Sequence, residues 1–146
     1  MKIINFKYIS SNKLDTNKIK KDFNRSCLIK YTIIDNFLKK EYATEIAHEH
    51  KNINIDSWLK YNHFNQKKMG ISDLQLMGKL TKKLIKELSS SKFTNWLNYV
   101  SGLDNLVSDP MLDGGGLHKI SKGGYLNIHT DFQSHTKKKN WKRRIN

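Results

Sequence analysis

Apolar residues recur with helical spacing in three stretches of the chain. The first runs from Phe37 to about His50, the second begins at Ser72, and the third spans Phe93 to Val100. Spacings of three and four residues place apolar side chains on one face of a helix. Ser72 and Gln75 match a capping box at the start of the second helix. Gly102 is the residue type expected just after the end of the third.

Strand-like patterns stand before, between and after these helices. Residues 28–34 are rich in β-branched and aromatic side chains and predict a strand, whereas residues 52–66 lack clean periodicity and predict an irregular or short-strand region. Residues 116–120 and 124–131 predict two short strands, joined as a hairpin through residues 121–123. Helices followed by strands, without regular alternation, indicate the α+β fold class.

The length of the chain suits one domain, because 146 residues can enclose a hydrophobic core. We expect a single domain with three parts: an N-terminal extension (1–27), a strand with a helical layer (28–107), and a C-terminal part (108–146). No apolar run approaches the roughly 20 residues of a membrane span. The lone Cys27 has no internal disulfide partner and is interpreted as a small buried residue on a strand. These features predict a cytoplasmic protein without a membrane segment.

The formal net charge of +14 raises the question of nucleic-acid binding. Lysine supplies 24 of the 27 basic residues, and the lysines are scattered along the chain, as the codon bias of an A+T-rich genome would also produce. Nucleic-acid readers usually gather basic residues on one face and include arginine. The single dense cluster, residues 137–144, is interpreted as a solvated loop. The composition therefore argues against nucleic acid as the primary ligand.

His129 and Asp131 are the residues with the clearest chemical potential. On a strand, alternate side chains share a face, so these two would point the same way and could reach one metal ion. They would supply two of the three positions of a 2-His-1-carboxylate facial triad, which binds non-heme Fe(II). The same residues also fit a strand-end histidine hydrogen-bonded to a turn aspartate. The motif alone leaves both interpretations open.

Other polar or aromatic motifs have simpler explanations. The imidazoles in His48-Glu49-His50 would diverge, because positions i and i+2 of a helix point roughly 200° apart, so these are interpreted as solvated helix residues. His63 is interpreted as a hydrogen-bonded polar residue. Residues 114–116 lack the Gly-Lys-Ser/Thr of a phosphate loop. Phe93 and Trp96 are expected to anchor the core.

The residues around His129 form a longer ordered series. It comprises Asp109-Pro110-Met111-Leu112-Asp113-Gly114-Gly115-Gly116-Leu117-His118, Gly123-Gly124-Tyr125-Leu126, His129-Thr130-Asp131-Phe132, His135 and Arg143-Arg144-Ile145-Asn146. This series closely resembles the 2-oxoglutarate and Fe(II)-dependent oxygenases of the prolyl 4-hydroxylase-like group. With the segment Ile34-Asp35-Asn36-Phe37-Leu38 and the helix containing Phe93, Trp96 and Leu97, the resemblance covers most of residues 28–146.

The resemblance implies a helical layer packed on a double-stranded β-helix, or jelly roll, of which this chain would hold the first strands. His129 and Asp131 would be iron ligands, with 2-oxoglutarate and O2 as co-substrates and ascorbate as a further candidate cofactor. The implied reaction is hydroxylation of a C–H bond coupled to decarboxylation of 2-oxoglutarate to succinate. Tyr125, four positions before His129, is a candidate for the 2-oxoglutarate pocket, with a core aromatic as the alternative. The substrate, a protein side chain or a small molecule, is left open.

The chain also departs from the family pattern. The distal histidine ligand, and the Arg or Lys that pairs with 2-oxoglutarate, follow the Arg-Arg-x-Asn segment in the family, whereas this sequence ends at Asn146. His118 and His135 lie too close in sequence to His129 to take the distal place. We therefore expect the chain to be inactive alone, with a second polypeptide as the partner that completes the fold. The alternatives are a non-catalytic remnant or binding module and a basic nucleic-acid-binding protein.

Overall fold

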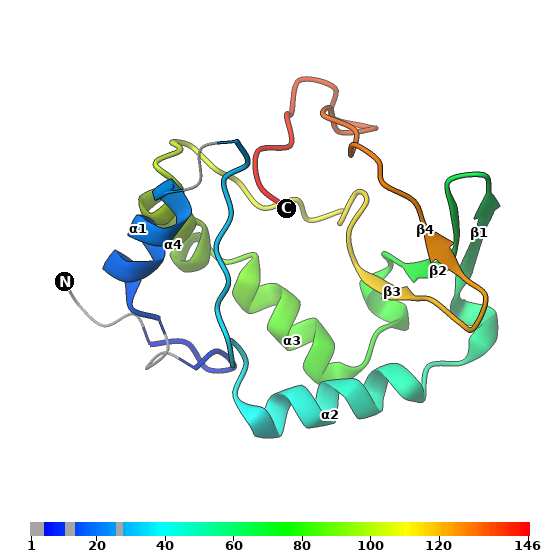
Figure 1. The fold of residues 1–146 in the computed structure, drawn as a ribbon. Coiled ribbons are helices and arrows are strands. Elements are labelled where there is room, and N and C mark those ends of the chain that lie inside the picture. The colour runs from blue at the N-terminus through cyan, green and yellow to red at the C-terminus, as the bar shows by residue number, and fades with distance from the viewer. Residues whose placement is uncertain (1–4, 11–13, 26–27) are drawn as a thin grey trace. The chain divides into compact units, whose positions relative to one another are not determined.

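A computed structural model describes residues 5–10, 14–25 and 28–146, so the prediction for Cys27 lies outside the described residues. Within them the fold is α+β, as predicted, with four α-helices and an open antiparallel sheet of four strands (Figure 1). The chain forms two compact units. The first comprises Met1–Glu49 and Gly78–Ser108, and the second comprises His50–Met77 and Asp109–Asn146.

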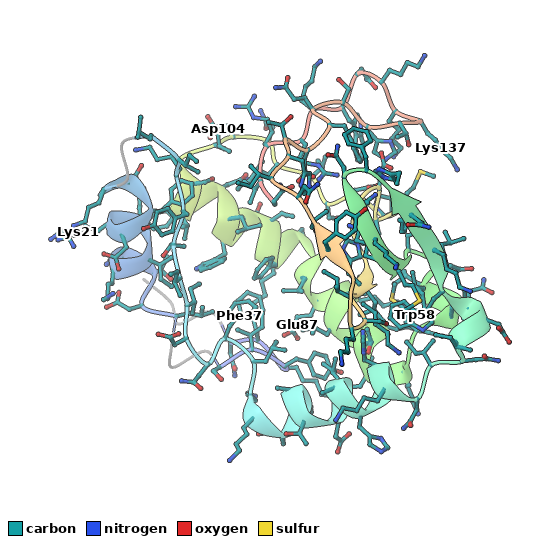
Figure 2. All side chains as sticks on the ribbon, turned by 45° about the vertical axis from the view of Figure 1, so that its right-hand side comes forward. Lys21, Phe37, Trp58, Glu87, Asp104 and Lys137 are labelled. Atoms are coloured by element: carbon teal, nitrogen blue, oxygen red, sulfur yellow. The ribbon has the colours of Figure 1, made fainter. Side chains whose placement is uncertain are left out.

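Helices build the first unit. They are α1 (Thr16–Arg25), α2 (Lys40–Lys51, whose last two residues belong to the second unit), α3 (Lys79–Leu88) and α4 (Ser91–Ser101). Phe93 and Trp96 of α4 are buried in the core, which confirms their predicted role. The Trp96 indole Nε1–H donates to Thr16 Oγ1 of α1 over 3.2 Å. The Phe37 ring, visible in Figure 2, lies edge-on to Phe93.

Local sequence signals predicted one helix end correctly and another wrongly. Gly102 ends α4 in the left-handed conformation with φ of 72°, and its N–H donates to Asn98 O, as predicted. The predicted capping box at Ser72 is wrong. Asp73 caps a short 3-10 helix, η3 (Leu74–Leu76), by accepting from the Gln75 N–H, and Gly78 in extended conformation delays the start of α3.

A carboxylate from another helix caps α3. Gly78 offers no capping side chain, and Glu49 of α2 instead accepts hydrogen bonds from Leu80 N, Thr81 N and Thr81 Oγ1 at 2.7 to 2.8 Å. The interpretation of Glu49 as a solvated helix residue is therefore wrong. Burial raises the pKa of the Glu49 carboxyl, but these hydrogen bonds outweigh that effect and hold the pKa below its usual value.

Replacing Glu49 by alanine is expected to lower the free energy of unfolding at neutral pH by about 1–2 kcal/mol, the usual cost of a lost helix cap. Because the pKa of Glu49 is lower in the folded protein than in the unfolded chain, the ionised carboxylate stabilises the fold at pH values above the unfolded pKa of about 4.3. This contribution is lost as the pH falls through the folded pKa. The stability gap between wild type and Glu49→Gln should therefore shrink on acidification. Urea unfolding at pH 7 and at about pH 3 measures both effects. An equal loss in Glu45→Ala, on the exposed part of α2, would contradict this role.

An antiparallel sheet dominates the second unit. Its strands are β1 (Leu59–His63), β2 (Gln66–Ile71), β3 (Leu117–Lys119) and β4 (Tyr125–Leu126). β1 and β2 form a hairpin, of which β1 lies within the region predicted as irregular or short-strand and β2 begins at the last residue of that region. The predicted hairpin between the last two strands is wrong, because β3 and β4 both pair with β2. They follow one another along the same edge of β2, and residues 120–124 loop out between them.

Two strand predictions fail because no partner lies alongside. Residues 28–34 are predicted as a strand but join no ladder, and Leu28 is 95% exposed. The predicted strand from Gly124 to Asp131 ends at Leu126, because β2 begins at Gln66 and offers no further partner. In the part of the chain that the structure describes, no helix has the length and apolarity required to cross a membrane.

Candidate metal centre

The segment that carries His129 and Asp131 leaves the sheet directly after β4. Asn127 fixes its start, because its backbone N–H donates to Asn65 O at 2.8 Å and its side-chain Nδ2 donates to Phe64 O at 3.0 Å. Both acceptors lie in the turn between β1 and β2. The hairpin turn therefore positions the two candidate ligands, although they lie beyond the end of the strand.

His129 and Asp131 face one another across 3.6 Å, measured from Nε2 to Oδ1. Each side chain is partly exposed, at 37% and 39%. His129 Nδ1 lies 2.7 Å from the Asn127 carbonyl oxygen and donates to it, so Nε2 is the ring nitrogen turned toward Asp131. A hydrogen bond on the other ring nitrogen is how metal-binding histidines are usually oriented.

The second oxygen of Asp131 is held by a different pair of residues. Arg143 NH1 lies 3.1 Å from Asp131 Oδ2, and Asn146 Nδ2 donates to the same oxygen at 2.5 Å. Arg143 NH1 also donates to Asn146 Oδ1, so the three side chains form a closed triangle. Arg143 is itself fixed by a bond from NH2 to Asp113 O and by stacking on Phe132. We call Arg143 and Asn146 the aspartate clamp.

This geometry suits either a shared metal ion or an ion pair between a protonated His129 and Asp131. A separation of 3.6 Å is too long for a hydrogen bond. Two donors at right angles, each about 2.1 Å from a metal ion, lie about 3.0 Å apart, so a small rotation of either side chain would suit both. Imidazole nitrogen and carboxylate oxygen are donors that fit Fe(II). Among the described residues, no group of three or more His, Cys, Asp or Glu side chains could hold a metal ion.

Tyr125, the candidate for the 2-oxoglutarate pocket, lies on β4. Its hydroxyl donates to the His63 carbonyl oxygen at 3.0 Å, and its side chain remains partly exposed. The phenol thus ties β4 to the end of β1. Its predicted role toward 2-oxoglutarate stays a prediction.

His135 is buried in a network that sequence reasoning missed. Its Nε2 lies 3.2 Å from Asp109 Oδ1, whereas Nδ1 accepts from the N–H groups of Lys137 and Lys138 and lies 3.5 Å from Asp113 Oδ2. The two carboxylates address opposite ring nitrogens, so the three side chains do not converge on one metal position. The network instead joins the loop at 109–113 to the loop that leads to the aspartate clamp.

The electrostatics of Asp109 support this structural role. Burial raises the pKa of Asp109, but hydrogen bonds from the N–H groups of Asp113 and Met111 and from His135 outweigh it, and the pKa lies below its usual value. Asp109 is therefore a carboxylate that accepts hydrogen bonds from the loops around it. Asp109, which accepts the hydrogen bond from His135, lies 26 residues earlier in the sequence.

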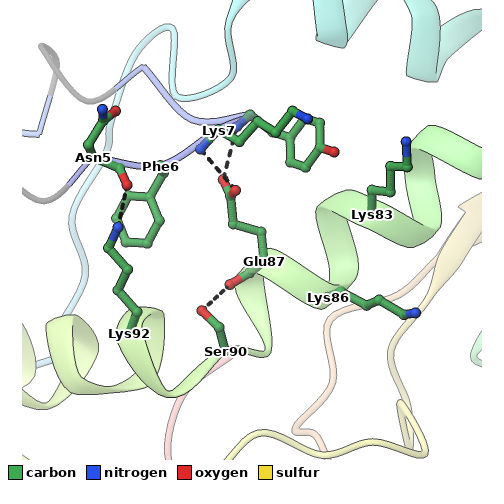
Figure 3. A pocket seen from close by; sticks show the side chains of 9 residues that line it. Asn5, Phe6, Lys7, Lys83, Lys86, Glu87, Ser90 and Lys92 are labelled. Carbon is green, nitrogen blue, oxygen red and sulfur yellow. Dashed lines mark hydrogen bonds between the residues drawn. The ribbon is translucent and has the colours of Figure 1, made fainter.

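A pocket of about 460 Å³ lies in the first unit (Figure 3). Lys83, Lys86 and Lys92 are among its lining residues, but its centre is occupied by Glu87. The Glu87 carboxylate accepts from the backbone N–H groups of Lys7 and Tyr8 at 2.9 and 3.0 Å. These bonds fasten the N-terminal segment to α3, and we assign the pocket a structural role.

The structure thus brings the two predicted ligands together and adds the aspartate clamp to them. Sequence reasoning named Arg143 and Asn146 only as part of a motif, because their contact with Asp131 depends on how the intervening loop folds. A shallow pocket of about 200 Å³ lies beside these residues. A scan against protein-family models finds no match, and searches of the curated proteins and of the solved structures find none either.

Proposed function

We propose that this chain supplies two ligands of the Fe(II) site of a 2-oxoglutarate-dependent dioxygenase of the prolyl 4-hydroxylase-like group, built on a double-stranded β-helix. The observation that carries the proposal is the orientation of His129 Nε2 and Asp131 Oδ1 toward one another, with their remaining polar atoms bound elsewhere. The resemblance of residues 109–146 to that family supports the choice of iron and 2-oxoglutarate.

In this proposal each residue of the site has a distinct task. His129 and Asp131 hold the metal, and the Asn127 carbonyl keeps the proton of His129 on Nδ1. The aspartate clamp directs Asp131 Oδ1 toward the metal position and partly balances the charge of the carboxylate. Bound Fe(II) with 2-oxoglutarate and O2 would supply the oxidative hydroxylation of a C–H bond. The third ligand in the family is a histidine, and no third donor joins His129 and Asp131 among the described residues.

The test is an anaerobic titration of the purified chain with Fe(II), followed by addition of 2-oxoglutarate. We expect one Fe(II) per chain, and affinity reduced more than about 100-fold in His129→Ala and in Asp131→Ala, because a ligand matters more than its hydrogen-bonding partners. A charge-transfer band should appear on adding 2-oxoglutarate only if a third ligand completes the triad with His129 and Asp131. His48→Ala, on the exposed surface of α2, is the matched control.

The outcome of this titration decides the assignment. Iron binding that survives both substitutions would show that the site is wrongly placed. A chain that takes up neither Fe(II) nor 2-oxoglutarate would support the alternative of a non-catalytic binding module.

A further inference from the structure

Trp58, the residue before β1, is buried against one face of the sheet. The other face presents aromatic and basic side chains to solvent. Because alternate residues of a strand share a face, the pairing register assigns one set of residues to it. The set, which we call the open face, consists of Leu59, Tyr61 and His63 of β1, Gln66, Lys68 and Gly70 of β2, His118 of β3, and Leu126 of β4.

Contacts between side chains confirm this assignment. A Cβ atom at Gly70 would lie 3.1 Å from the Tyr61 ring and 3.4 Å from the His118 ring, so both rings flank the bare backbone of β2. Lys68 Nζ lies 5.8 Å from the Tyr61 ring centroid and 3.5 Å from His118 Nδ1. Burial and the Lys68 ammonium lower the pKa of His118, which favours the neutral imidazole. The centre of the open face is a cation between two flat rings.

The opposite face provides the packing of the sheet. Ile71 is buried there, and Lys119 Nζ lies 5.8 Å from the ring of the buried Trp58 (Figure 2). The open face, in contrast, remains accessible. Tyr61 is 38% exposed, and Phe64, in the adjoining hairpin turn, is 82% exposed.

The sheet also carries charge of one sign. Residues 59–71 and 117–126 contain no Asp or Glu, and they contain the five lysines Lys60, Lys67, Lys68, Lys119 and Lys122. Of these five, Lys68 lies on the open face, Lys60, Lys67 and Lys119 lie on the opposite face, and Lys122 lies in the loop after β3. With Lys68 at its centre and no carboxylate in these segments, the open face is complementary to an anionic partner. Exposed rings beside lysines fit a polymer that alternates flat bases with phosphates, because bases stack on aromatic side chains and phosphates pair with ammonium groups.

We propose that the open face, with Phe64, binds a single-stranded nucleic acid. Tyr61 and Phe64 stack on bases, and Lys68 pairs with a phosphate between them. Five residues of β1 span about 13 Å, which accommodates a few nucleotides. The total charge of the chain gave no such indication, because scattered lysines are uninformative. On the sheet, in contrast, Tyr61, Lys68 and His118 lie together.

The test is fluorescence anisotropy of a labelled oligothymidylate of about ten nucleotides with the full chain, in EDTA so that metal binding plays no part. We expect the wild-type chain to bind, and Phe64→Ala and Tyr61→Ala each to bind about tenfold more weakly. Lys68→Gln should weaken binding and reduce the slope of log K against log salt by about 0.7. Phe64 protrudes from a turn, so Phe64→Ala tests stacking without disturbing the fold.

Matched substitutions elsewhere separate the open face from general charge. Tyr31→Ala removes an exposed ring of the first unit, and Lys139→Gln removes a lysine of the C-terminal cluster. We expect both to bind as the wild type does. The proposal is overturned if the wild type does not bind, if Phe64→Ala binds as tightly as Tyr31→Ala, if Lys68→Gln and Lys139→Gln are equivalent, or if a duplex or polyglutamate binds as tightly as the single strand.

Discussion

Replacing Arg143 by alanine is expected to weaken metal binding at His129 and Asp131 by about 10- to 100-fold, the usual effect of losing a group that orients a ligand. The guanidinium fixes Asp131 Oδ2 at 3.1 Å and is itself held by Asp113 O and the Phe132 ring. Without it, the carboxylate can rotate and its charge is less balanced. Mn(II) titration followed by electron paramagnetic resonance measures the affinity without requiring turnover.

Two further substitutions make this expectation specific. Arg143→Lys keeps the charge but loses the planar fork that contacts Asp131 and Asp113 together, so an intermediate affinity is expected. Arg144→Ala removes a neighbouring arginine that lines the same pocket and should leave affinity unchanged. If Arg143→Ala and Arg144→Ala bind Mn(II) equally well, the aspartate clamp does not position the ligand. Thermal melting of each variant checks that folding is preserved.

Replacing Trp96 by alanine is expected to lower the free energy of unfolding by about 3–5 kcal/mol, the range for deleting a large aromatic side chain from a core. The indole is 4% exposed, packs against Phe93, and donates to Thr16 Oγ1. Because small domains have only about 5–15 kcal/mol of stability, this change removes a large fraction of it. Urea unfolding followed by helical circular dichroism is the measurement.

Tyr99, three positions after Trp96 on α4, provides the comparison. Tyr99 is partly exposed, its hydroxyl donates to Asn17, and Lys20 lies over its ring. Tyr99→Ala should cost no more than about 1 kcal/mol. Trp96→Phe, which retains most of the apolar contact but lacks the N–H, should fall between wild type and Trp96→Ala. Equal losses in Trp96→Ala and Tyr99→Ala would contradict the assignment of Trp96 to the core.

Local patterns predicted the elements that depend on neighbouring residues. The spacing of Phe93, Trp96 and Val100 predicted α4 and its buried face, and Gly102 predicted its end. Pairing partners were less accessible from sequence. β3 and β4 are joined by a turn, yet each pairs with β2, which lies some 50 residues earlier. The lysine-rich helix α1 was not predicted, because its packing against α4 comes from tertiary contacts that polar composition conceals.

The candidate site likewise combines a feature that local spacing predicted with contacts that it could not predict. His129 and Asp131 lie two positions apart, so their shared side could be predicted, even though the strand expected to present them ends earlier. The contact from Asn146 to Asp131 spans 15 residues and follows from a loop whose path the sequence does not encode in any periodicity. The role of Glu49 was missed for a related reason, since its partners lie on another helix, 31 and 32 residues away.

The brevity of β4 has a consequence for how long the candidate ligands stay in place. Only two residues of β4 pair with β2, supplemented by the bonds of Asn127 and the Tyr125 hydroxyl. Segments tied by so few bonds open far more often than the whole molecule unfolds. On the β4 side, the pair His129 and Asp131 is therefore tied down by one short strand that frays locally, with the aspartate clamp as its other tether. Amide protons of residues 125–131 should exchange with solvent well before those of α4.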